Sequence, residues 1–103
     1  MKYKVIRSDL AEQDLMSIVN YIADDSKNID VALNYLDKLE RPIMKLSDFP
    51  YMGVIPRYKS IRIQGFRVLI VESHLVFYKI DESVKQVIVY RIFHSKQDYQ
   101  NLI

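Results

Sequence analysis

Cysteine is absent from the 103 residues of the chain. This absence excludes a disulfide framework, a thiolate metal site and a cysteine nucleophile, and it fits a reducing compartment. The apolar stretches are short, as at Val68–Val71, and none is long enough to cross a membrane as a helix. The first 14 residues lack the apolar core of a signal peptide. We therefore expect a cytoplasmic protein that makes no membrane contact.

Glycine is scarce, with two residues, while half of the chain is hydrophobic. A chain of this length and composition predicts one folded domain over residues 1–103. It contains no phosphate-binding glycine loop, no GxSxG motif and no HExxH motif. The two histidines, His74 and His94, lack the spacing of metal ligands. We therefore expect neither a metal site nor a cofactor.

The N-terminal half reads as one strand followed by two helices. Residues 2–7 are typical of a short strand, and Ser8 is placed to cap a helix over residues 9–24. A polar turn at 24–28 precedes a second helical pattern from Ile29 to Leu46. Pro42 lies inside that pattern, and we expect it to kink or interrupt the helix near Glu40–Arg41. The short link predicts an antiparallel helical hairpin.

The C-terminal half reads as strands joined by short turns. Strands are expected at 58–63, 66–72, 75–80 and 85–93, with turns at 64–65, 73–74 and 81–83. Short links favour antiparallel neighbours and therefore a β-meander. A short C-terminal helix is expected at 95–102. The predicted fold class is α+β: an N-terminal strand, an antiparallel helical hairpin, then an antiparallel β-meander with a short C-terminal helix.

The last three predicted strands are apolar on both faces, as Val68 and Leu69 illustrate. The helical hairpin can cover only one face, whereas a sheet with one wet face alternates apolar and polar residues. We therefore expect the C-terminal helix, a second copy or a partner segment to cover part of the other face.

Charge is divided unevenly along the chain. Residues 1–50 carry a net charge of −2 and residues 51–103 a net charge of +4. Four cations and no acid lie between Arg57 and Arg67, and Arg91 follows near the end of the last strand. These groups suit phosphate binding and the stabilisation of charge in phosphoryl transfer, and Tyr90, Phe93 and Tyr99 suit stacking on bases. The alternatives are ordinary sheet-edge charge and core aromatics.

His94 ends the last predicted strand. A histidine at this position is suited to move a proton near neutral pH, and it is equally suited to cap the final helix or to fill a structural pocket.

Four blocks of residues, in this order, resemble the RelE/ParE superfamily of toxins from bacterial type II toxin–antitoxin systems. Two blocks come from the helical half: Ser8-x-x-Ala11-x-x-Asp14-Leu15-x-x-Ile18-x-x-Tyr21-Ile22, and Leu46-x-x-Phe49-Pro50-x-x-Gly53. Two come from the strands: Gly65-Phe66-Arg67-Val68-Leu69 with Val76–Asp81, and Val89-Tyr90-Arg91-Ile92-Phe93-His94-Ser95-Lys96-Gln97-Asp98-Tyr99. The resemblance covers nearly the whole chain.

The resemblance implies a toxin held inactive by a cognate antitoxin from a neighbouring gene, whose acidic and apolar tail lies over the helices and the sheet. RelE-like members cleave mRNA on the ribosome, and this mechanism is favoured here. The alternative is ParE-like inhibition of DNA gyrase, without catalysis. The RelE-like mechanism assigns catalytic roles to Arg67, Arg91 and His94. It assigns RNA binding to the cations and to the C-terminal aromatic residue, namely Arg57, Lys59, Arg62, Lys96 and Tyr99.

Overall fold

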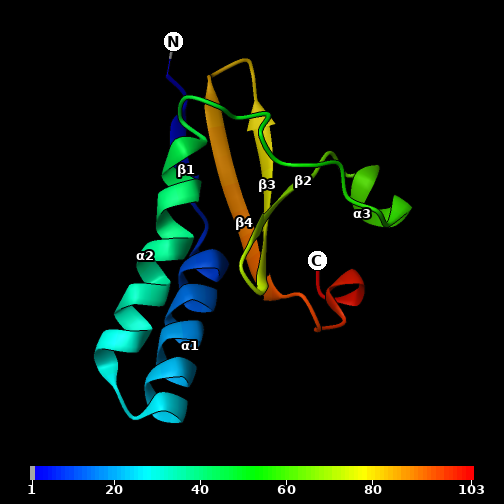
Figure 1. The fold of residues 1–103 in the computed structure, drawn as a ribbon. Helices are drawn as coiled ribbons and strands as arrows, with labels where there is room; N and C mark the ends of the chain where they lie inside the picture. Colours follow the sequence, from blue (N-terminus) through cyan, green and yellow to red (C-terminus); the bar gives the residue numbers. More distant parts are fainter. Residues whose placement is uncertain (1) are drawn as a thin grey trace.

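The computed structural model describes residues 2–103, in which one strand is followed by helices and then by the other strands (Figure 1). The N-terminal half forms β1 (Lys4–Arg7), α1 (Asp9–Ser26) and α2 (Ile29–Lys45). The C-terminal half forms α3 (Lys59–Arg62), β2 (Arg67–Val71), β3 (His74–Asp81), β4 (Gln86–His94) and a 3₁₀ turn at Tyr99–Asn101. This order confirms the predicted α+β class.

The four strands form one sheet in the order β1-β4-β3-β2. Strands β2, β3 and β4 are antiparallel neighbours, as the short links predicted. Strand β1 pairs with β4 in parallel, with Lys4 opposite Gln86 and Arg7 opposite Val89. A parallel pair needs a long connection, and the helices together with β2 and β3 supply it between β1 and β4. Strand β1 lies at the edge and makes the sheet mixed.

The helical hairpin packs on one face of the sheet (Figure 1). The Ser8 hydroxyl accepts the N–H of Ala11 at 3.0 Å, which confirms the predicted cap of α1. At the end of β1, Arg7 forms ion pairs with Glu12 of α1 (2.8 Å) and Glu40 of α2 (2.7 Å). These carboxylates raise the Arg7 pKa, and the hydrogen bond that Arg7 donates to Glu40 contributes most. One guanidinium therefore fastens both helices to the sheet.

Pro42 does not interrupt α2, contrary to the expectation. The helix continues to Lys45, although Pro42 removes a backbone donor from its interior. The adjacent side chains of Leu39, Ile43 and Leu46 are almost fully buried against the sheet. Their burial offsets the cost of the missing hydrogen bond, which is about 3 kcal/mol in an isolated helix.

The predicted strand at 58–63 is wrong, because these residues form the short helix α3. The carbonyl of Tyr58 accepts the N–H groups of both Ile61 and Arg62, which closes a helical turn. Ile61 is fully buried whereas Ile63 is 74% exposed, so the apparent alternation does not mark one buried strand face. Gly65, with a φ of 89°, then turns the chain into β2.

The C-terminal helix predicted at 95–102 is also wrong in extent. Only the 3₁₀ turn at Tyr99–Asn101 is helical, and residues 95–98 form a turn. The N–H of Lys96 binds Nδ1 of His94, and the N–H of His94 binds the side chain of Gln97. These hydrogen bonds hold residues 94–97 outside a regular helix.

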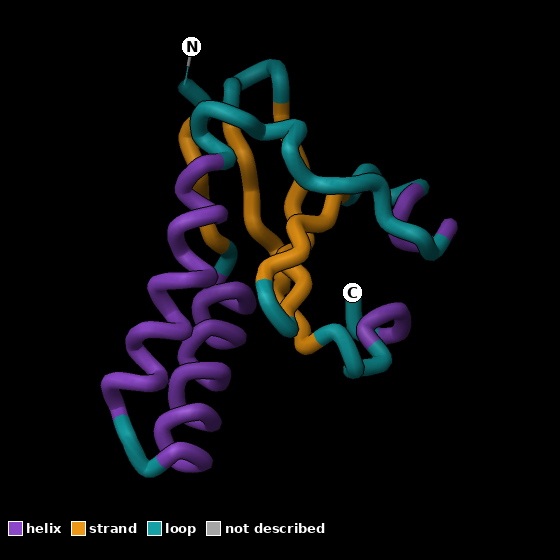
Figure 2. The backbone as a smooth tube through the Cα atoms, in the orientation of Figure 1, coloured by secondary structure: helices purple, strands orange, loops and turns teal. Residues whose placement is uncertain are grey.

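The sheet lies between two layers, and the tube view shows the hairpin on one side of it and α3 with the C-terminal segment on the other (Figure 2). The second face carries a core of its own: Ile61, Phe66, Val68, Leu75, Phe77 and Phe93, with Tyr58, Tyr90, Tyr99 and Ile103 packed against it. The expectation that this face is covered is therefore confirmed for the C-terminal segment, and the α3 segment adds cover that was not predicted. Within residues 2–103, no helix is long and apolar enough to cross a membrane.

Candidate functional site

Arg91 is held by an ion pair with Asp14 of α1. Its Nε and Nη2 donate to the two carboxylate oxygens at 2.9 and 3.1 Å, and the N–H of Ile92 donates to the same carboxylate at 2.8 Å. The hydrogen bonds that Arg91 donates to Asp14 raise the Arg91 pKa. The guanidinium also lies 4.5 Å from the centre of the Phe93 ring. This geometry fastens α1 to β4 just beyond the end of β1.

Arg67 is held by backbone carbonyls of the loop between α2 and α3. Its Nη2 donates to the carbonyls of Tyr51 (3.0 Å) and Gly53 (2.6 Å), and the guanidinium lies over the Tyr51 ring at 5.4 Å. Its Nε is buried without a hydrogen-bond partner among residues 2–103. The side chain that the resemblance makes catalytic is therefore used here to anchor a loop.

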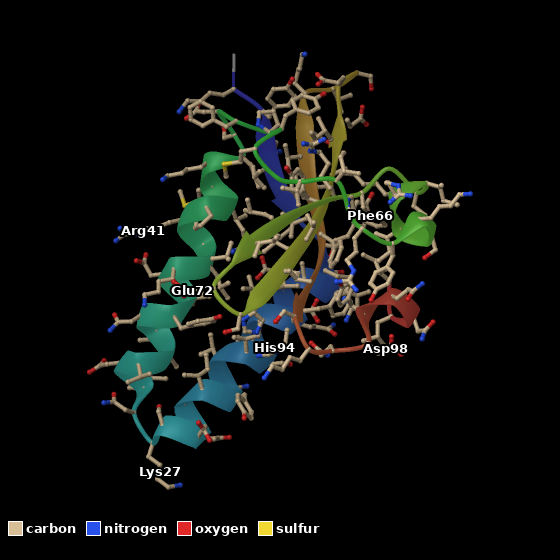
Figure 3. All side chains as sticks on the ribbon, turned by 45° about the vertical axis from the view of Figure 1, so that its right-hand side comes forward. Lys27, Arg41, Phe66, Glu72, His94 and Asp98 are labelled. Carbon is tan, nitrogen blue, oxygen red and sulfur yellow. The ribbon has the colours of Figure 1, made fainter. Side chains whose placement is uncertain are left out.

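His94 lies at the end of β4, whereas Arg67 lies level with the middle of β3. Strand register places Arg67 opposite Tyr78 of β3, and His94 opposite His74. At about 3.3 Å per residue, positions 74 and 78 are separated by about 13 Å along β3. Figure 3 shows His94 beside α1, at the end of β4 (Figure 3). The structure does not bring the predicted catalytic residues Arg67, Arg91 and His94 together.

The predicted RNA-binding cations are more exposed to solvent than Arg67 and Arg91. Arg57, Lys59, Arg62 and Lys96 are all exposed, and none forms an ion pair with a carboxylate within residues 2–103. Arg57 lies over the ring of Tyr58 at 5.1 Å. Arg62 donates to the carbonyls of Pro56 and Arg57 at 3.2 and 3.1 Å, which braces the start of α3.

Arg57 lines an apolar pocket of about 370 Å³, and Lys59 and Lys96 directly follow the lining residues Tyr58 and Ser95 in the chain. The loop before α3 and the C-terminal segment meet there, because Tyr58 and Tyr99 pack edge to face with ring centres 5.6 Å apart. The pocket is lined by Val54, Ile55, Pro56, Arg57, Tyr58, Val68, Ile70, Leu75, Phe77, Ser95 and Tyr99. We call this pocket, together with Arg57, Lys59, Arg62 and Lys96, the α3 face.

The three candidate stacking residues belong mainly to the second core. Phe93 is 2% exposed, and Tyr99 packs against it with parallel rings whose centres are 6.4 Å apart. Tyr90 is half-buried beside Phe66, and Lys79 lies over both rings. Tyr99 alone of the three also lines the pocket of the α3 face.

A polar cluster at the first residue of β3 was not predicted from the sequence. His74 was assigned to a turn, but it begins β3, is 8% exposed and lies edge-on to His94 with ring centres 5.2 Å apart. Its Nδ1 is 2.6 Å from the hydroxyl of Tyr35 in α2. Burial, aided by His94, lowers the His74 pKa. The pairing of the two histidines follows from strand register, which the sequence alone does not fix.

Within residues 2–103, no group of three or more histidine and carboxylate side chains could hold a metal ion.

Comparison with solved structures shows the fold. The chain superimposes with a TM-score of 0.74 and 16% identity on a structure of the chromosomal ParDE toxin–antitoxin system from P. aeruginosa, covering 90% of this chain and 96% of that one. It superimposes with a TM-score of 0.58 and 19% identity on the RelBE2 toxin–antitoxin complex from Mycobacterium tuberculosis, covering 91% and 99%. A search of curated proteins finds no match.

The family model of the ParE toxin of the type II toxin–antitoxin system parDE matches residues 5–99. The match runs from β1 to the C-terminal 3₁₀ turn and so spans both layers of the sheet. The chain therefore belongs to the ParE family of type II toxins.

Proposed function

We propose that this toxin arrests growth by binding its target through the α3 face, not by cutting RNA, and that the target is DNA gyrase. The observation that carries the proposal is the contrast between two sets of cations. Arg67 and Arg91 are engaged within the fold, while Arg57, Lys59, Arg62 and Lys96 carry no carboxylate partner within residues 2–103. Arg57 lines the apolar pocket, and the other three cations lie on the two chain segments, around α3 and after β4, that meet there. A basic rim around an apolar pocket suits a protein surface that presents acids around an apolar side chain.

The separation of the candidate catalytic groups supports binding over catalysis. A general acid or base has to reach the same reacting atoms as the group that stabilises the developing charge. Strand register offsets Arg67 and His94 by about 13 Å along β3, and they lie on β2 and β4, on opposite sides of that strand. Arg91, between them, is neutralised by Asp14. Membership of the ParE family also favours the gyrase alternative.

Ribosome-dependent mRNA cleavage is the second candidate. It is favoured by the exposed cations of the α3 face, since phosphate backbones are bound by lysine and arginine side chains of this kind. Tyr99, which lines the same pocket, could stack on a base. The two candidates differ in the target, and the same surface serves both.

A supercoiling assay separates the candidates. The purified chain should inhibit DNA supercoiling by purified gyrase, and it should leave mRNA on translating ribosomes uncut. The double variant Lys59→Glu/Arg62→Glu should weaken inhibition at least ten-fold, because it places like charges against an acidic target surface. The matched control is Lys38→Glu, an exposed charge change on α2, away from the α3 face. Undiminished supercoiling together with specific mRNA cuts would contradict gyrase inhibition and favour RNA cleavage.

We also propose that a cognate antitoxin from a neighbouring gene binds the helical hairpin. The hairpin exposes large apolar side chains, among them Met16, Tyr21, Ile29, Leu33 and Met44. Met16 and Leu33 line a groove of about 270 Å³ between the helices. Exposed apolar area of this kind typically marks a protein interface. The double variant Met16→Glu/Leu33→Glu should fail to co-purify with the neighbouring gene's product, and it should still arrest growth.

A further inference from the structure

A second pocket, of about 480 Å³, lies between the helical hairpin and the far end of the sheet. Its size falls within the range of small-molecule sites. Ile18, Tyr21 and Ile22 of α1 form part of an apolar wall, and Ser17, Tyr35, Ser73, His74, His94 and Gln97 complete the lining. None of these nine residues is acidic. We call this cavity the histidine pocket.

Hydrogen bonds orient both imidazole rings of the pocket. Nδ1 of His94 accepts the N–H of Lys96 at 3.1 Å, so the proton of the neutral ring lies on Nε2. The hydroxyl of Tyr35 accepts the N–H of Ser73 at 3.3 Å and lies 2.6 Å from Nδ1 of His74. The hydroxyl has no other acceptor within residues 2–103, so we assign its proton to the hydrogen bond with Nδ1, which places the proton of the neutral His74 ring on Nε2. Two Nε2–H donors therefore remain without an acceptor in the described part of the chain.

A third donor comes from Gln97. Its carbonyl oxygen accepts the N–H of His94 at 2.7 Å, which leaves the amide N–H groups free to donate. The pocket thus offers several donors and no carboxylate beside an apolar wall. This tautomer assignment also disfavours a transition metal, because a metal requires the lone pair of a ring nitrogen and Nε2 carries the proton.

We propose that the histidine pocket binds a small organic carboxylate with a compact apolar body. The carboxylate accepts the Nε2–H groups of His74 and His94, whose rings lie 5.2 Å apart. An acceptor-only group with two oxygens matches a set of two or more donors. The apolar body packs on Ile18, Ile22 and the ring of Tyr35. Such a ligand joins α1, α2 and the ends of β3 and β4 at one point, away from the α3 face.

The experiment is an NMR titration of the full chain with 3-phenylpropionate, compared with 3-phenyl-1-propanol, which has a similar shape and lacks the carboxylate. The carboxylate should cause saturable shifts of the His74 and His94 imidazole signals, and it should bind at least ten-fold more tightly than the alcohol. Equal affinity for the two compounds, or no shift of either imidazole, would overturn the proposal.

Two variants test the donors. His94→Leu removes one Nε2–H and should weaken binding of 3-phenylpropionate at least ten-fold, while His94→Gln, which keeps an N–H donor, should stay within about three-fold of the parent. Tyr35→Phe should also weaken binding, because it removes the proton that orients His74. This second variant decides the outcome if His94→Leu does not fold. Unchanged affinity in a folded His94→Leu or Tyr35→Phe variant would refute the assigned donors.

Discussion

Asp14 of α1 and Arg91 of β4 form a two-point ion pair, and the same carboxylate accepts the backbone N–H of Ile92. The pair lies just beyond the last residue of β1, which pairs with Val89. Asp14 therefore takes the place that a further residue of β1 would hold at this edge of β4. One side chain thus closes the sheet edge and neutralises an arginine that the resemblance had made catalytic.

We expect Asp14→Ala to lower the free energy of unfolding by about 2 kcal/mol, because it leaves the partly buried guanidinium of Arg91 and the backbone N–H of Ile92 without their hydrogen-bond acceptor. The side chains of Arg91 and Asp14 are 23% and 16% exposed. The matched control is Asp37→Ala, which breaks the exposed pair with Arg41 and should cost no more than about 0.5 kcal/mol. Urea denaturation measures both. A loss in Asp14→Ala no larger than the control's would contradict the structural role.

Gly53 packs against the hydroxyl of Tyr78, and we expect Gly53→Ala to lower stability by about 3 kcal/mol. An added Cβ would lie 2.5 Å from the Tyr78 hydroxyl and 2.8 Å from the Val68 carbonyl. Adding Tyr78→Phe should not restore stability, because the contact with the Val68 carbonyl remains and the removed hydroxyl leaves the Gly53 N–H and the Pro50 carbonyl unpaired. Thermal unfolding of the single and double variants checks this. Full recovery in the double variant would show that the backbone contact is harmless.

Glu82, in the β3–β4 turn, accepts hydrogen bonds from the hydroxyls of Tyr51 and Tyr3 and from Lys85. These hydrogen bonds lower the Glu82 pKa to about 2, and the bond from Tyr51 contributes most. Because the folded pKa lies below the unfolded value, the stabilisation is present above about pH 4.5 and disappears as the pH falls towards 2. The stability difference between the parent chain and Glu82→Gln should therefore shrink over this interval. A difference that stays constant from pH 5 to pH 2 would refute the shift.

His94→Ala should still arrest growth if the toxin acts by binding through the α3 face. His94 borders the histidine pocket and is absent from the pocket of the α3 face. Lys59→Glu/Arg62→Glu should lose growth arrest. The two variants are compared by colony counts after induction, with circular dichroism to confirm folding. A folded but harmless His94→Ala would instead support proton transfer by this residue.

The local elements could be predicted from the sequence because their signals are local. Ser8 and the helical spacing of apolar residues predicted α1, and short turns predicted the β2–β3–β4 meander. The α3 segment could not be predicted from alternation, because its neighbouring isoleucines differ in burial only through tertiary packing. The parallel pairing of β1 with β4 depends equally on contacts between distant residues.

The candidate site was harder to predict than the fold. Three cations of the α3 face, Arg57, Lys59 and Arg62, stand out in the sequence because no acid lies among them. The sequence could not reveal that Asp14 forms an ion pair with Arg91, because the two residues are 77 positions apart in the chain. The cluster of His74, His94 and Tyr35 was equally hidden, since it depends on strand register and on the placement of α2.

The most direct test of the central claim, that growth arrest comes from binding gyrase, is pulse-labelling of DNA and protein synthesis in the first minutes after this chain is induced alone in a bacterial host. We predict that DNA synthesis falls first. Protein synthesis that stops before DNA synthesis would contradict the claim and would favour cleavage of mRNA on the ribosome.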